Sequence, residues 1–295
     1  MTATQFIPKT QYKRLARPLV FFFGLAYALA WGALGVLHLI ARQSGIESGL
    51  VLLQMGEAFQ FGNSTPIVAP WIIYLLTRLA DFAFSIAGIV TIALTTGREG
   101  LLVLWQRLTR WRMAWRWYAL GLLPLGLYGV AVLVAGGVES AKITSTTLTT
   151  VLFSLHSGFF VSLFLRGAFG EEFGLRGFAL PYLQERMSPF RASLVIGVLW
   201  GAWHLPVLWG RDALSIVAFA LLSIGLSMLF TLLFNGSGGS LIPVLLFHAT
   251  QNWEEGFETF FPALVGTDWE LISTLSLLVV GLIAGIILKR AHTRW

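Results

Sequence analysis

Apolar stretches of about twenty residues recur along the chain, and this feature constrains the fold more than any other. A helix of about 20 apolar residues crosses a hydrocarbon layer of about 30 Å. Hydrophobic residues make up 56% of the 295 residues and charged residues only 12%, which leaves little polar loop between the stretches. We therefore expect an all-α integral membrane protein, a single bundle of about eight transmembrane helices over residues 1–295. The expected spans are 19–40, 69–95, 117–138, 148–168, 190–209, 213–235, 240–259 and 270–289.

The charged residues are distributed unequally between the two sides of these expected spans. One side receives most of the Lys and Arg, including those at both termini, while the other side receives most of the acids. Basic loops favour the cytoplasmic face of a membrane. We therefore expect a multi-pass protein of a prokaryotic cell membrane with both termini in the cytoplasm. The apolar run that ends near Ile40 is too long for the h-region of a signal peptide, so we expect an uncleaved first span.

A stretch rich in tryptophan and arginine, residues 105–117 (WQRLTRWRMAWRW), precedes the third expected span. Tryptophan favours the depth of the lipid headgroups, and arginine is attracted to anionic lipids. The stretch therefore predicts an interfacial helix. The formal net charge of +6 needs no nucleic acid to explain it. We expect the lipid bilayer and a peptide or protein substrate, itself able to be membrane-anchored, as partners, and no nucleic acid.

Two adjacent carboxylates, Glu171 and Glu172, interrupt the apolar sequence, and Arg176 follows them. On a helix Glu172 and Arg176 are spaced i, i+4, so they can form an ion pair that anchors the helix. Glu171 points about 100° away and has no local counter-ion. Ionisable groups at membrane depth are costly and mark functional sites. We interpret Glu171 as a free carboxylate that can act as a general base. The alternative is that both acids line a polar helix end near the cytoplasmic surface.

Further polar side chains fall in the next expected spans. His204 lies in the apolar segment 198–204, and His248 and Asn252 are one helical turn apart near the end of the chain. A single intramembrane histidine is often a structural residue. Polar insertions on three separate spans are better explained by a site in which they converge.

A carboxylate, two histidines and an amide meet the needs of amide hydrolysis without a covalent nucleophile. Glu171 would take a proton from water and His204 would orient that water. His248 and Asn252 would donate hydrogen bonds to the oxyanion. A divalent metal such as zinc could instead be held by Glu171, His204 and His248. The chain has no His-Glu-x-x-His motif, so a zincin-type site is not indicated and the cofactor stays unknown.

A second acid–base pair, Arg78 and Asp81, lies inside the second expected span at spacing i, i+3. Either charge alone would be costly in lipid, while the two can face each other on one side of a helix. We interpret them as a buried structural ion pair.

At these residues the chain resembles the CPBP family (CAAX proteases and bacteriocin-processing enzymes, also called Abi). That family carries Glu-Glu-x-x-x-Arg, Phe-x-x-x-His and His-x-x-x-Asn/Asp motifs on three helices of an eight-helix bundle. Here these positions are Glu171, Glu172 and Arg176; Trp200 and His204; and His248 and Asn252. The resemblance covers about 145–260, the expected catalytic core, and implies an intramembrane endopeptidase. Trp200 departs from the usual Phe, which puts only the shape of the pocket in doubt.

Two other classes of function remain open at this point. A proton-coupled membrane transporter would use the intramembrane Glu and His residues as a proton relay. No inverted repeat with paired broken helices is recognisable in the sequence, which counts against a secondary carrier. A non-catalytic scaffold or immunity protein would have no need for Glu171, His204, His248 and Asn252 within lipid.

Overall fold

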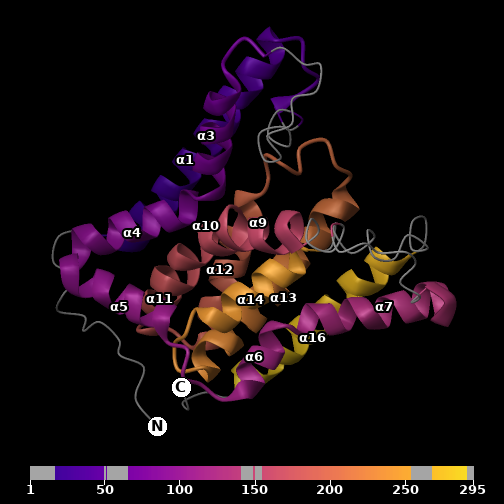
Figure 1. Cartoon of the computed structure of the whole chain (residues 1–295). Coiled ribbons are helices and arrows are strands. Elements are labelled where there is room, and N and C mark those ends of the chain that lie inside the picture. The colour runs from indigo at the N-terminus through magenta and orange to yellow at the C-terminus, as the bar shows by residue number, and fades with distance from the viewer. Residues whose placement is uncertain are drawn as a thin grey trace.

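The computed structural model describes residues 17–49, 51, 66–140, 149, 155–253 and 268–290, and all regular elements within these ranges are helices (Figure 1). Among the described helices, three can cross a membrane by length and composition: α1 (Pro18–Gln43), α13 (Ala213–Gly236) and α16 (Trp269–Arg290). The pair α3 (Pro70–Asp81) and α4 (Ala83–Thr95), bent by 63°, can supply a fourth span. The all-helical fold with candidate membrane spans is confirmed for the described residues, and the count of eight spans stays a prediction.

The remaining expected spans are shorter or interrupted, for local reasons. Expected span 190–209 is α12 (Pro189–Trp203), which Ser188 caps by accepting from the Arg191 amide and which ends before Pro206. Expected span 117–138 is divided between two helices, and parts of 148–168 and 240–259 lie outside the described residues. The other helices are α5 (Gly97–Thr109), α6 (Trp115–Gly121), α7 (Leu123–Ser140), η2 (Leu155–Phe160), α9 (Val161–Phe164), α10 (Gly167–Gly174), η3 (Leu175–Ala179), α11 (Leu180–Gln184) and α14 (Ile242–Gln251).

Helix α10 lies in the interior, packed against α4 on one side and α14 on the other (Figure 1). Glycines permit the approach to α4, since a Cβ at Gly88 would lie 2.6 Å from the Cα of Gly174. The hydroxyl of Ser85 on α4 also donates to the Phe169 carbonyl at 2.7 Å. Elsewhere in the bundle, the hydroxyl of Ser227 on α13 donates to the Ser193 carbonyl of α12 at 2.9 Å. These contacts fix the short helices between the long ones.

A π-helical segment, η3, directly follows α10. Its wider turn leaves backbone carbonyls free for other donors, and such segments often lie at functional sites. The Gly177 carbonyl accepts from Arg107 Nη1 at 2.5 Å, which ties α5 to η3. Arg107 is therefore buried rather than interfacial, contrary to the expectation for the Trp–Arg stretch. Trp105, Trp111 and Trp115 of that stretch are exposed, as an interfacial location requires.

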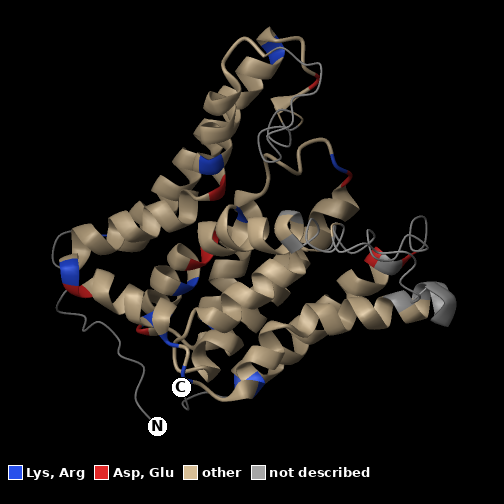
Figure 2. Cartoon of the chain, viewed as in Figure 1, with Lys and Arg blue, Asp and Glu red and all other residues tan. Residues whose placement is uncertain are grey.

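Charged residues are few along the helices and fall into two kinds of place (Figure 2). Most lie at helix ends, where water or lipid headgroups can solvate them. A small group of acids with a basic neighbour lies inside the bundle, on α10 and η3. This interior group contains Glu171, Glu172 and Arg176, and it is the starting point for the site.

Candidate active site

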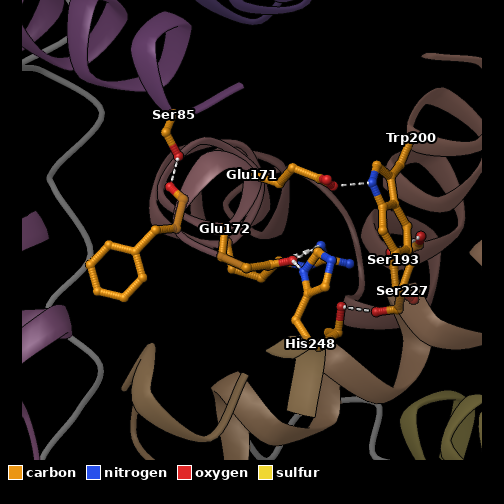
Figure 3. Close-up of polar contacts among 10 residues, drawn as sticks. Ser85, Glu171, Glu172, Ser193, Trp200, Ser227 and His248 are labelled. Carbon is orange, nitrogen blue, oxygen red and sulfur yellow. Dashed lines mark hydrogen bonds and ion pairs between the residues drawn. The ribbon is translucent and has the colours of Figure 1, made fainter. Parts of the chain in front are cut away.

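Glu171 lies on α10 with 6% of its surface exposed, and its carboxylate points at α12 (Figure 3). The indole N–H of Trp200 donates a hydrogen bond to Glu171 Oε2. No described cation forms a salt bridge with Glu171, as the sequence predicted. The carboxylate thus keeps its lone pairs available, apart from the one that Trp200 occupies.

Glu172 points to a different side of α10, toward α14 (Figure 3). Nη1 of Arg176 donates to both of its oxygens at 3.0 Å, which confirms the predicted i, i+4 pair. Nδ1 of His248 lies 2.7 Å from Glu172 Oε1. Because an ionised carboxylate only accepts hydrogen bonds, His248 must carry its proton on Nδ1. Glu172 therefore fixes the orientation of His248 as well as the position of Arg176.

Arg176 is fully buried between two aromatic rings. Its guanidinium carbon lies 5.3 Å from the Trp200 ring centroid and 4.7 Å from that of Phe230. Such cation–π contacts offset part of the cost of burying the charge. The Phe230 ring also contacts His248, at a centroid distance of 5.5 Å. Ion pair, histidine and aromatic rings therefore form one packed unit.

His204 follows the last residue of α12 as its C-cap. Its Nδ1 lies 2.9 Å from the Trp200 carbonyl oxygen, which can only accept, so Nδ1 donates. The neutral ring then has its lone pair on Nε2, which can accept a proton from water. The rings of His204 and of His248 each lie 5.8 Å from the Trp200 ring, so Trp200 contacts both histidines as well as Glu171.

Asn252 is the C-cap of α14, one turn after His248, and it is exposed. A Cβ atom built on Gly167 would lie 2.7 Å from Asn252 Nδ2 and 2.7 Å from His248 Nε2. The two nitrogens therefore flank the same point at the beginning of α10. The structure thus brings Glu171, Glu172, Arg176, Trp200, His248 and Asn252 into one region, with His204 against Trp200.

A three-ligand metal site does not fit this geometry. Among the described residues, no three His, Cys, Asp or Glu side chains are close enough together to hold a metal ion. The bonds of Nδ1 to Glu172 in His248 and to the Trp200 carbonyl in His204 leave only Nε2 of each ring for a ligand. The set of Glu171, His204 and His248 considered from the sequence is not such a group, and no step below depends on a metal.

Two contacts of this site were missed by the sequence analysis. The spacing of Trp200 and His204 puts them on one helix face, but it does not indicate that the indole reaches Glu171. The bond between Glu172 and His248 joins residues 76 positions apart, and no local pattern predicts it. Both contacts depend on how α10 packs against α12 and α14.

The part of the chain that contains these residues matches a known family. Residues 153–253 match the family described as type II CAAX prenyl endopeptidase Rce1-like. A 63-residue stretch is 40% identical to CAAX prenyl protease 2 of Methanococcus maripaludis, and it covers 21% of this chain and 23% of that protein. The chain thus matches about a quarter of the length of that relative. The resemblance to the CAAX protease family is confirmed.

Proposed function

Residues 153–253 match the Rce1-like CAAX prenyl endopeptidase family, and from this premise we propose that the chain is an intramembrane endopeptidase. The observation that carries the proposal is the buried Glu171 carboxylate, which has no ion-pair partner among the described residues and lies beside histidines held in defined orientations. A buried carboxylate of this kind suits a general base better than a structural anchor. Glu172, in contrast, is fully engaged by Arg176 and His248.

In the proposed reaction Glu171 takes a proton from a water molecule, whose oxygen attacks the carbonyl carbon of the scissile peptide bond. His204 orients this water through the lone pair on Nε2. The carbonyl oxygen becomes an oxyanion, which accepts from Asn252 Nδ2 and from His248 Nε2 when the ring is protonated. Glu171 then returns the proton to the leaving nitrogen as the C–N bond breaks. No covalent enzyme intermediate is required.

His248 is well suited to its role because of its partner. Its Nδ1–H donates to Glu172, which fixes the orientation of the ring. The protonated ring has a second N–H, on Nε2, which faces Gly167. Glu172 and Arg176 act on the reaction through His248 and Trp200 and do not touch substrate themselves.

The relative's name suggests which substrates to examine first. We propose that the substrate is a peptide or protein held at the membrane, with prenylated CAAX sequences as the first candidates. We also propose that both termini are cytoplasmic, as the basic loops predict. A reporter fused to either end that is active only in the cytoplasm would test this orientation.

Mass spectrometry of a peptide library tests the proposed activity. The library contains farnesylated CAAX peptides and their unmodified forms, and it is incubated with the detergent-purified protein or with its Glu171→Gln variant. We expect new peptide termini with the wild-type protein and none with the variant. Cleavage by both proteins would remove Glu171 from the chemistry, and cleavage by neither would contradict the proposed activity on these peptides.

A further inference from the structure

The beginning of α10 lies directly against the two proposed oxyanion donors. Gly167 is the first residue of this helix, and a Cβ at that position would lie 2.7 Å from both His248 Nε2 and Asn252 Nδ2. Real Cβ atoms do not approach other side chains so closely, so any other residue would push the donors away. Gly167 thus allows α14 to bring its donors to the end of α10.

In the described structure, the first turn of α10 has unpaired backbone N–H groups next to His248 and Asn252. The amides of Gly167, Ala168 and Phe169 have no acceptor among the described residues, and the first paired amide is that of Gly170, which donates to the Arg166 carbonyl at 2.9 Å. The side chain of Arg166, the N-cap residue, does not cap the helix. Unpaired amides at a helix N-terminus point outward along the axis and attract negative charge.

A second, independent feature indicates that a ligand belongs at this helix end. His248 is only 2% exposed, and its Nε2 makes no hydrogen bond within the described structure although it faces Gly167. An unpaired ring nitrogen on an otherwise buried side chain leaves a hydrogen-bonding position that a ligand can use. The side-chain amide of Asn252 lies beside it. Backbone and side-chain donors therefore converge on one small region.

The position of Glu171 fits this arrangement. Gly167 and Glu171 are spaced i, i+4, so they occupy the same face of α10, about 5–6 Å apart between Cβ positions. Helical side chains lean toward the N-terminus, so the Glu171 carboxylate extends in the direction of Gly167. A substrate carbonyl group placed between Gly167 and Glu171 would have its carbon next to the water that Glu171 activates. Its oxygen would lie next to the hydrogen-bond donors.

We propose that the first turn of α10 completes the oxyanion pocket. The backbone N–H groups of Gly167 and Ala168, together with His248 and Asn252, bind the scissile carbonyl oxygen as it gains negative charge. Gly167 is a positioning residue, because its missing side chain is what lets these donors converge. This inference rests on the proposed function, since it assigns a role to backbone groups in that same reaction.

Replacing one backbone amide tests the proposal directly. Lactic acid in place of Ala168, introduced by nonsense suppression, exchanges the N–H for an ester oxygen and leaves the side chain unchanged. This N–H has no described protein acceptor, but the ester also weakens the Gly167 carbonyl as a helix acceptor, so we expect a small fall in melting temperature. We expect kcat to fall about 10²-fold, typical of a lost oxyanion donor, with little change in KM. An unchanged kcat, or a parallel loss of kcat and melting temperature, would overturn it.

A second experiment tests the convergence without using activity. Melting temperatures are compared for the wild-type protein, Gly167→Ala, Asn252→Ala and the double variant. We expect the effects not to add, because truncation of Asn252 makes room for the new methyl group. Additive effects would overturn the proposed contact. Gly126→Ala is the matched control, since Gly126 on α7 is exposed with nothing within 4 Å of its Cβ position, and its effect should add to that of Asn252→Ala.

The two experiments separate this inference from the proposed function. If the wild-type protein cleaves no peptide of the library, the proposed function fails on those substrates, while the melting temperatures still decide whether Gly167 and Asn252 are in contact. If the wild-type protein cleaves a peptide and the ester variant cleaves it equally well, the protease activity is supported and the role proposed for the first turn of α10 is contradicted.

Discussion

Two ion pairs of this protein look alike in sequence but lie in different surroundings. Arg78–Asp81 and Glu172–Arg176 each join neighbouring turns of a helical segment, at 2.9 Å and 3.0 Å. The first pair lies where α3 bends into α4, with side chains 12% and 16% exposed, and the second is fully buried. Arg78 also donates to the Leu165 carbonyl and lies over the Tyr74 ring. Its contacts are with structural groups.

The inner pair differs because its acid also binds a histidine of the site. Glu172 binds His248, whereas Asp81 packs its backbone against Gly170 of α10, where a Cβ would lie 2.3 Å from the Asp81 carbonyl oxygen. An ion pair within a membrane thus does not reveal its role by spacing alone. The role of an ion pair depends on what else its charged groups contact, and variants of both pairs can test this difference.

The largest effect is expected from removing the acid of the inner pair. Glu172→Gln leaves the buried Arg176 charge without its counter-ion, a change that costs about 3–5 kcal/mol of unfolding free energy. Asp81→Asn should cost clearly less, because Arg78 is partly exposed and keeps its other contacts. Thermal unfolding in one detergent compares the two variants. Equal losses would mean that the two pairs do not differ as described.

Neutralising both partners sharpens the same comparison. Replacing a buried ion pair by uncharged groups is often nearly neutral for stability. We expect the double variant Arg78→Gln/Asp81→Asn to regain most of the melting temperature and to keep most of the turnover. Glu172→Gln/Arg176→Gln should regain stability only in part and should stay inactive, because His248 loses its carboxylate. Recovery of turnover in this second variant would contradict the role given to Glu172.

A smaller effect is expected at the aromatic position beside the inner pair. Trp200→Phe keeps a ring next to Arg176 but removes the N–H that binds Glu171. We expect kcat to fall about tenfold, the equivalent of about 1.4 kcal/mol, with a small change in melting temperature. Trp203→Phe is the control, since its buried Nε1 has no hydrogen-bond partner in the described structure. Equal losses in the two variants would show that only packing matters.

The smallest effect concerns an exposed acid outside both pairs. The hydroxyl and then the amide of Ser215 donate to Asp212, the N-cap of α13, and lower the pKa of Asp212 below its ordinary value. The stabilisation from these bonds is therefore present above the ordinary pKa and is lost as the pH falls through the lowered one. We expect wild type and Asp212→Asn to converge in melting temperature on acidification. A constant difference would contradict this.

The sequence predicted the parts of this site that depend on local spacing. The helical pair Glu172–Arg176, the pair Arg78–Asp81 and the free carboxylate of Glu171 all followed from i, i+3 and i, i+4 geometry and from the cost of charge in lipid. The family motifs indicated which distant residues to group. What local patterns could not predict was the packing of α10, which turns Glu172 toward His248 and lets Trp200 reach Glu171.

The number and continuity of the spans were also beyond the sequence pattern. Hydropathy does not distinguish one long helix from two short ones that meet at a polar site. Within a membrane, breaks in a helix are tolerated where the backbone is buried in protein. The π-helical turn of η3 and the early end of α12 at Trp203 lie next to the site, where neighbouring helices supply partners such as Arg107.

The central claim is that Glu171 activates water while Glu172 holds the structure, and the Glu171→Gln variant tests it most directly. Turnover of a cleaved peptide and the melting temperature are measured on the same preparation. We predict that kcat falls by about 10²- to 10⁴-fold, the contribution of a general base, while the melting temperature is maintained. Retained turnover, or a loss of activity that simply follows unfolding, would contradict it.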